Sequence, residues 1–415
     1  MKRHWLLGSA LLIGSAMAAA DVVTQWNQAA LNTIAAHNIS PPAAARNLAM
    51  LHAAIYDAVN GIVRTHEPYL AGGEAPFGAS AEAAAAAAAR DVMAALYPDA
   101  QAIFDELLSV TLSSIPDGTY EDKGTAWGSS AAARVLDDRR DDGSEAVVSW
   151  PASDQPGEWR PTDSFGGVVL PALLPKWGSV EPFALDTGAR FRPPAPPALY
   201  TGRYAKELNE VQALGGIDSV DRTIDQTEIA YFWGYGPNTS TPPGHWNEVA
   251  QAVAGTQGNS LPENARMFAL MNIAMADAAI VSWDAKYTFN YWRPITAVRL
   301  ADTDGNRMTM PDTAWTPLLP TPPFPEYTSG HSTFSGAAAV TLALFYRRDS
   351  IPFSLGSEDL PGVYRFYDGF WEAALESGMS RIYGGIHFMS ANTRGLLTGA
   401  RTGRYVFDHV LEPVE

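Results

Sequence analysis

Three separated blocks between residues 283 and 387 hold the side chains best suited to binding an anion. The first block contains Lys286 and Arg293. A continuous helix would place both cations on one face, about 10 Å apart along its axis, and Pro294 would end that helix near Arg293. Two long cationic side chains arranged in this way can converge on one oxyanion. The alternative interpretation is two solvated cations on an exposed face.

The second block is a proline-rich approach to a helix start. Pro322–Pro325 cannot continue a helix, whereas Thr328 and Ser329 are good N-caps. Free N–H groups and the positive end of the helix dipole favour an anion there, and Gly330 would let an oxygen approach the main chain. His331 would then face the anion from the first helical turn. The alternative is an ordinary capped helix with a partly buried histidine.

The third block ends in a histidine. Arg381 can donate a bidentate fork to an oxyanion, and Gly384 and Gly385 permit a turn tight enough for His387 to reach the same centre. Each block alone is weak evidence. Together, in this order and in a chain with 45 acidic and 28 basic residues, they indicate one anion-binding catalytic site.

The composition excludes several other classes of function. A net charge of -17 repels nucleic acids and anionic lipid surfaces, so no nucleic-acid partner is expected. The absence of cysteine excludes disulfides, thiol catalysis and metal sites with thiolate ligands. With 47% hydrophobic and 18% charged residues, the sequence is typical of a compact globular protein.

The first twenty residues predict a cleavable export signal. Lys2 and Arg3 precede the apolar stretch Trp5–Met17, and the small residues Ala18–Ala20 precede Asp21. The alternative is an uncleaved anchor, although the apolar stretch is short for a bilayer span. We identify no later membrane-spanning segment and therefore expect a secreted or periplasmic protein without integral membrane association.

Helical periodicity dominates the rest of the chain, and alternating strand patterns are scarce. Residues 141–200 are rich in Pro, Gly, Trp and Ser but keep apolar side chains, so we expect a long ordered loop excursion instead of a linker. The sequence predicts an all-α, bundle-like single domain over residues 21–415. The expected helices are Val22–Ala36, Pro41–Val59, Ala81–Leu96, Tyr120–Leu136, Asp221–Trp233, Leu261–Tyr291, Gly330–Tyr346 and Thr393–Val410.

The order of the three blocks resembles the signature shared by vanadium-dependent haloperoxidases and the type 2 phosphatidic acid phosphatase superfamily. Its parts are Lys-(six residues)-Arg-Pro, then Ser-Gly-His, then Ser-Arg-(five residues)-His. Similarity to the bacterial chloroperoxidase-like branch extends to Asn47–His52, Trp159–Thr162 and Thr241–Trp246. The resemblance implies a helical fold built around four-helix bundles, with an oxyanion pocket formed by residues 283–387.

The resemblance also implies a role for each block. His387 would bond directly to vanadium, and His331 would be the acid–base residue beside the apical oxygen. The equatorial oxygens of the anion would be held by cations and N–H or O–H donors, namely Lys286, Arg293, Ser329, Gly330 and Arg381.

The implied activity is oxidation of halide by hydrogen peroxide to hypohalous acid, with vanadate as the cofactor and bromide favoured over chloride. The alternative is a soluble exported acid phosphatase that hydrolyses a phosphate monoester with His387 as nucleophile, because vanadate resembles the transition state of phosphoryl transfer. A non-catalytic oxyanion-binding protein is a third interpretation. Each of the three is compatible with a homo-oligomer.

Two aromatic residues are expected on the halide side of the site. Trp283 and Phe324 stand where fungal chloroperoxidases, which this sequence resembles, carry a Trp and a Phe. The alternative for both is simple core packing.

The sequence departs from the family pattern at three places. Thr328 replaces the Pro that usually precedes Ser-Gly-His. Ala391 stands where an Asp commonly orients the ligand histidine, so Asn392 or a backbone carbonyl is the candidate substitute. No acidic partner for His331 is found after Phe232-Trp233.

Overall fold

The computed structural model describes residues 21–70, 72–165 and 167–414, and the predicted export signal at residues 1–20 lies outside them. The described residues form thirteen α-helices and four short strands, so the all-α prediction is confirmed. The strands form two antiparallel pairs: β1 (Asp163–Phe165) with β2 (Val168–Val169), and β3 (Phe353–Leu355) with β4 (Arg365–Tyr367).

Small side chains hold the N-terminal helices close together. The alanines of α3 that face its neighbours are buried, and a Cβ at Gly128 of α5 would collide with the backbone of Ala84. These short contacts bring α5 against α3, which packs in turn on α2. The N-terminal helices are α1 (Val22–Ala36), α2 (Pro41–Val63), α3 (Ala81–Leu96), α4 (Gln101–Leu112) and α5 (Thr119–Asp138).

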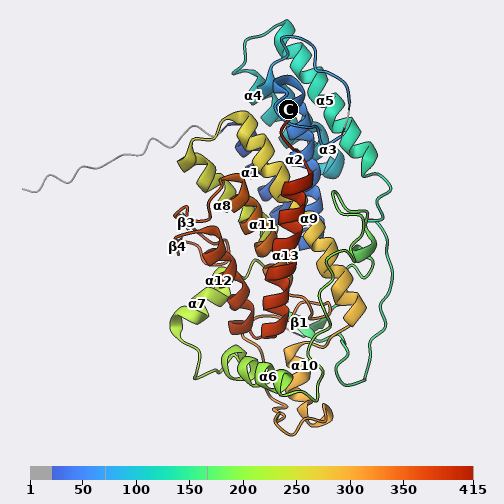
Figure 1. The fold of residues 1–415 in the computed structure, drawn as a ribbon, viewed down its shortest axis with the longest axis vertical. Coiled ribbons are helices and arrows are strands. Elements are labelled where there is room, and N and C mark those ends of the chain that lie inside the picture. Colours follow the sequence, from blue (N-terminus) through green and yellow to red (C-terminus); the bar gives the residue numbers. More distant parts are fainter. Residues whose placement is uncertain (1–20, 71, 166, 415) are drawn as a thin grey trace, which may run out of the picture.

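Glycines play the same part in the C-terminal bundle. Gly399 and Gly403 of α13 lie against the backbone of α11, where a Cβ would overlap main-chain atoms. The bundle consists of α9 (Leu261–Phe289), α11 (Gly330–Phe345), α12 (Phe370–Tyr383) and α13 (Met389–His409), with α8 (Thr241–Gln257) alongside. Three further helices, α6 (Gly202–Gly215), α7 (Ile224–Phe232) and α10 (Pro294–Arg299), lie towards the end of the molecule opposite α4 and α5 (Figure 1).

Helix α9 joins the two groups of helices. It packs on α2 at one side and on α11 and α13 at the other. Its length and hydropathy are those of a membrane span, which the sequence analysis did not identify, but 94% of its most apolar window is buried inside the fold. Asp277 of α9 accepts backbone N–H bonds from Phe183, Ala184 and Leu185. This carboxylate ties the loop excursion of residues 141–200 to the central helix.

Periodicity predicted the strongly patterned helices well. The bounds of α1 and α3 agree with the prediction, and those of α11 differ by one residue. Helices α4, α6, α8, α10 and α12 were not predicted. Two consecutive prolines, Pro242 and Pro243, lie in the first turn of α8 and obscure its helical pattern. The omission of α12 matters most, because this helix carries Arg381.

Candidate functional site

The first block does not form one continuous helix. Helix α9 ends at Phe289, and Asn290 adopts the left-handed conformation with φ 47°. Arg293 is instead the N-cap residue of α10. The prediction that Lys286 and Arg293 lie on one helix face is therefore wrong, although the turn between the two helices still brings both cations to the second block.

Lys286 is fully buried, and its ammonium group contacts three backbone carbonyls. It donates to the oxygens of Pro325 at 3.1 Å and Glu326 at 3.2 Å, and also to the oxygen of Thr328. An ammonium group has three N–H donors, so all three are engaged in this structure. Burial and the nearby charge of Arg293 hold the pKa of Lys286 well below its ordinary value. Three donated hydrogen bonds require the ammonium form, so this contact pattern holds the positive charge of Lys286 behind Phe324 despite the lowered pKa.

Arg293 has one free donor group. Its Nε donates to Phe324 O at 2.8 Å, and its Nη1 donates to Ile386 O at 2.8 Å and lies 3.2 Å from His387 Nε2. Its Nη2 is buried and has no hydrogen-bond partner within the described part of the chain. Burial lowers the pKa of Arg293 to about 10. An unpartnered guanidinium nitrogen beside a histidine is a site that an anion would satisfy.

The second block forms the predicted helix start. Ser329 is the N-cap of α11, and its Oγ accepts a hydrogen bond from the backbone N–H of Ser332 at 3.3 Å and lies 2.8 Å from the Ser332 hydroxyl. A Cβ at Gly330 would stand in the cavity, 3.7 Å from the ring of Trp283. The glycine therefore leaves open the space that an oxyanion at the helix N-terminus needs.

His331 is held by a backbone carbonyl instead of an acidic side chain. Its Nε2 lies 3.2 Å from Gly234 O, in the loop after α7. Because a carbonyl only accepts, Nε2 carries the proton and Nδ1 remains an acceptor in the neutral ring. Burial, and next the charge of Arg381, lower the pKa of His331 well below its ordinary value.

The third block connects two helices through a tight turn. Arg381 lies near the end of α12, is 1% exposed, and donates from Nη2 to Ala230 O at 3.0 Å. Burial lowers the pKa of Arg381 to about 9. Gly385 adopts a φ of 75°, and the N–H of Ile386 returns to Arg381 O. The turn places His387 just before α13, in the same cavity as Arg381.

Glu326 is a site residue that the sequence analysis did not identify. Its Oε1 accepts hydrogen bonds from His387 Nδ1 and from the backbone N–H of Phe388, both at 2.8 Å. This contact puts the proton on Nδ1 and makes Nε2 an acceptor, which faces Arg293 Nη1 at 3.2 Å in this structure. Burial and the neighbouring cations hold the pKa of His387 far below its ordinary value, so the ring is neutral and can act as a ligand.

The proposed substitute at Asn392 is therefore wrong. Asn392 Oδ1 accepts a hydrogen bond from Ser332 at 2.9 Å, while Glu326 takes the position beside His387. The available signal was Glu326 itself, a lone acid in the apolar, proline-rich second block. Its distance from His387 along the sequence concealed the pairing.

The predicted residues gather around one cavity of about 420 Å³. Lys286, Arg293 and Ser329 are buried and are not part of its lining. The predicted residues that line it are Trp283, Phe324, Gly330, His331, Arg381 and His387.

The two aromatic residues form one wall of this cavity. The ring centroids of Trp283 and Phe324 lie 5.0 Å apart. Lys286 Nζ lies 4.8 Å from the centroid of Phe324, and the guanidinium carbon of Arg293 lies 4.7 Å from it. The Phe324 ring therefore contacts two of the buried cations.

The site carries an excess of positive charge. Lys286, Arg293 and Arg381 are all buried. The carboxylate that acts on Lys286 and Arg293 is Glu326. Asp359 lines the cavity and acts on Arg381, so three cations stand against two acids. Burial raises the pKa of Glu326 to about 8, which limits its negative charge near neutral pH. Among the described residues, no group of three or more His, Asp or Glu side chains is arranged to hold a metal cation. The donor set fits an oxyanion.

Comparisons with known proteins agree with this chemistry. A family model described as the VCPO second helical-bundle domain matches residues 266–415. The vanadium chloroperoxidase of Curvularia inaequalis is 30% identical over 264 residues, covering 49% of this chain and 43% of the fungal protein. The chain thus aligns with less than half the length of that curated relative.

Solved structures extend the similarity along almost the whole chain. The crystal structure of a bacterial vanadium-dependent iodoperoxidase is 28% identical, covers 95% of this chain and 97% of its own, and has a TM-score of 0.83. The holo-type structure of a bacterial vanadium-dependent chloroperoxidase shares the fold, with 16% identity, coverage of 95% and 93%, and a TM-score of 0.72. In sequence and in fold, the chain is therefore similar to the vanadium haloperoxidase family.

Proposed function

We propose that this protein is a vanadate-dependent enzyme that oxidises halide with hydrogen peroxide to hypohalous acid. The observation that carries the proposal is the buried excess of positive charge next to His387, formed by Lys286, Arg293 and Arg381. The relatives described as a chloroperoxidase and an iodoperoxidase support the same reaction class.

The residues fit vanadate as the resident group. His387 Nε2 would supply the bond to vanadium, and Arg293 Nη2, the N–H groups at Gly330 and the guanidinium of Arg381 would hold its oxygens. Lys286 would neutralise charge through its position behind Phe324. When bound, vanadate serves as a Lewis acid towards peroxide, without a change of its own oxidation state.

The chain's own contribution is orientation and proton transfer. Glu326 keeps the proton of His387 on Nδ1. His331 holds its ring by donating from Nε2 to Gly234 O, so its Nδ1 is the atom that can take a proton from a peroxide or water molecule in the cavity. The lowered pKa keeps this nitrogen free of a proton near neutral pH.

Within this reaction we propose that bromide is used more readily than chloride. Bromide is easier to oxidise, whereas chloride demands a more strongly activated oxidant. The wall of Trp283 and Phe324 excludes water and leaves a poorly solvated halide near the cations. His331 is held by a carbonyl and not by a carboxylate, so the ring is weakly activated as a base. Weak or absent chloride turnover is the expected result.

One pair of assays distinguishes this proposal from a phosphatase. Halide oxidation with peroxide and hydrolysis of a phosphate monoester are measured on protein with and without added vanadate. The proposal requires bromide oxidation that appears on vanadate addition. Phosphomonoester hydrolysis that vanadate inhibits, without halide oxidation, would instead assign the pocket to phosphoryl transfer with His387 as nucleophile.

We also propose export through residues 1–20, which gives a secreted or periplasmic enzyme. N-terminal sequencing of the protein recovered outside the cytoplasm tests this, with a mature chain beginning at Asp21 as the expected result.

A further inference from the structure

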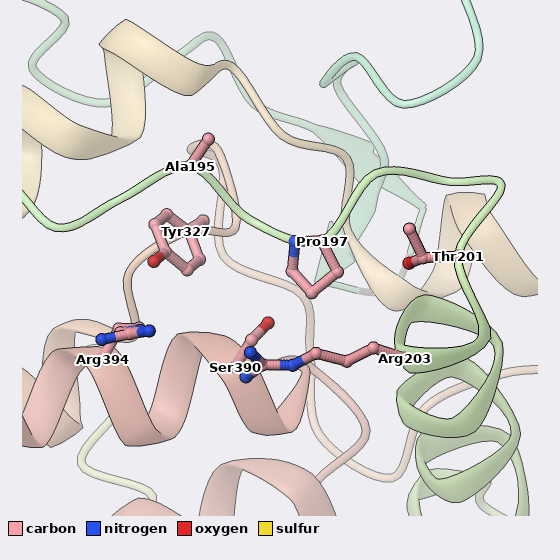
Figure 2. Close-up of a pocket in the computed structure, with 7 residues that line it drawn as sticks. All are labelled: Ala195, Pro197, Thr201, Arg203, Tyr327, Ser390 and Arg394. Carbon is pink, nitrogen blue, oxygen red and sulfur yellow. The ribbon is translucent and has the colours of Figure 1, made fainter.

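A second cavity, of about 170 Å³, lies between α6, the start of α13 and the loop that carries Ala195 and Pro197. Figure 2 shows Arg203 reaching from α6 towards Ser390, with Arg394 on the same helix as Ser390. The lining of this cavity shares no residue with that of the cavity around His387. The two cavities are therefore separate binding spaces.

Ser390 offers an unused polar group to this second cavity. It is 2% exposed, and its hydroxyl has no hydrogen-bond partner in the described residues. It lies in the first turn of α13, a helix of 21 residues, where the dipole favours an anion. Its backbone N–H already donates to Glu207 Oε2 at 3.1 Å, so the hydroxyl is the donor that remains for a ligand.

The arginines give this cavity a net positive charge. Arg203 Nε donates to Glu207 Oε1 at 2.9 Å, and this ion pair leaves the Nη groups of the 55% exposed arginine available. Arg394 is half-buried and makes no hydrogen bond or ion pair within the ranges that the structure describes. Two arginines against one carboxylate leave one uncompensated charge. The buried, unpartnered hydroxyl of Ser390 lines the same cavity as this uncompensated charge.

We propose that this cavity binds a small oxyanion, held by the guanidinium groups of Arg394 and Arg203 and by the hydroxyl of Ser390. The chemistry required is a compact group with at least two acceptor oxygens, because a guanidinium fork pairs with two oxygens at once. A short organic carboxylate and an inorganic oxyanion both meet this requirement. Tyr327 and Pro197 give the cavity apolar walls suited to the methyl or methylene part of a carboxylate.

The test uses vanadate-loaded protein, so that the site at His387 is filled. Sulfate and acetate are titrated separately by calorimetry, and crystals are soaked in selenate to locate the anion by its anomalous signal. The variants are Arg394→Gln and Ser390→Ala, with Arg401→Gln as the control, because Arg401 is an exposed arginine of the same helix outside the cavity. Halide turnover is measured in parallel.

The expected result is selenate between Arg203, Ser390 and Arg394, with anion affinity lowered about 10-fold or more in Arg394→Gln and about 3-fold in Ser390→Ala. Arg401→Gln should bind as the wild type does. If acetate binds and sulfate does not, the cavity is a site for a short carboxylate. If sulfate binds and acetate does not, it is a site for an inorganic oxyanion. Equal affinity in the wild type and Arg394→Gln, or an absence of selenate at this cavity, overturns the proposal. Because Arg394 lies outside the peroxide site, failure of the proposed halide oxidation would appear only in the turnover assay.

Discussion

Glu326 Oε1 accepts a hydrogen bond from His387 Nδ1 at 2.8 Å, although the two residues are 61 positions apart in the chain. The same oxygen accepts the N–H of Phe388. One carboxylate thus fixes both the histidine ring and the backbone that leads into α13. It accepts the Nδ1 hydrogen bond that the resemblance assigns to an Asp after the last histidine, where this chain has Ala391.

The first prediction concerns this pair. Glu326→Ala should weaken vanadate retention about 10-fold to 100-fold, because His387 loses the acceptor that orients it. Glu326→Gln should recover part of the loss, since an amide oxygen can still accept from Nδ1. Equilibrium dialysis measures both. Asn392→Ala is the matched control, as Asn392 binds Ser332 and should leave the affinity within about 2-fold. If vanadate affinity fell only in the Asn392 variant, Asn392 and not Glu326 would be the residue that orients His387.

The second prediction separates a direct bond from a charge effect. His387→Ala should abolish vanadate retention, because Nε2 would make the only bond from the chain to vanadium. Lys286→Ala should only weaken retention, because its three N–H donors already contact backbone carbonyls. The Lys286 variant should also melt at a lower temperature, since it leaves these buried carbonyls unpaired. Vanadate affinity unchanged in the His387 variant would contradict the assignment of the whole site.

The third prediction separates binding from chemistry at His331. His331→Ala should keep most of the vanadate affinity and lose about 10²-fold to 10⁴-fold in bromide oxidation, the usual contribution of a general acid or base. Dialysis and steady-state kinetics on the same preparation test this. Normal turnover in the variant would make His331 a structural residue held by Gly234.

The fourth prediction concerns the aromatic wall. Phe324→His or Trp283→Ala should change the ratio of bromide to chloride kcat/KM more than vanadate affinity, because both rings line the cavity near the buried cations. Wild-type protein should oxidise bromide clearly and chloride weakly or not at all. Identical halide ratios in all three proteins would mean that the rings serve only to pack the core.

The fifth prediction is a pH effect at the loop that holds His331. Tyr235 donates to Glu248 Oε2 at 3.1 Å, and burial together with the charge of Glu358 raises the pKa of Glu248 to about 7. The folded protein therefore binds this proton more tightly than the unfolded chain does. The stability it contributes is complete below about pH 4.5 and is lost as the pH rises through about 7.

Glu248→Gln keeps an acceptor for Tyr235 without the charge. Its Tm should equal that of the wild type at pH 4.5 and exceed it by roughly 2 to 4 °C at pH 8, for a gain of about 3 kcal/mol. Calorimetry at the two pH values gives the comparison. A constant Tm difference at both values would mean that Glu248 does not titrate between them.

Local patterns in the sequence determined much of the fold and the identity of the blocks. The start of α11 at Ser329 and the bounds of α1 and α3 depend on caps and periodicity within a few residues, so they can be deduced from neighbouring side chains. The three anion-binding blocks were likewise recognisable, because their residue types and spacing are local. The periodic pattern did not reveal α8, because two prolines stand in the first turn of this helix.

Tertiary structure decided which of these residues meet and which atoms they use. The turn between the end of α9 and the start of α10 lets Lys286 donate to backbone carbonyls of the second block. The same turn leaves Arg293 Nη2 without a partner among the described residues. Glu326 reaches His387, and Gly234 reaches His331 over 97 positions. The sequence predicted a cationic oxyanion site. Its partners depend on packing between distant helices, because a hydrogen bond across such separations leaves no periodic or nearest-neighbour signal in the chain.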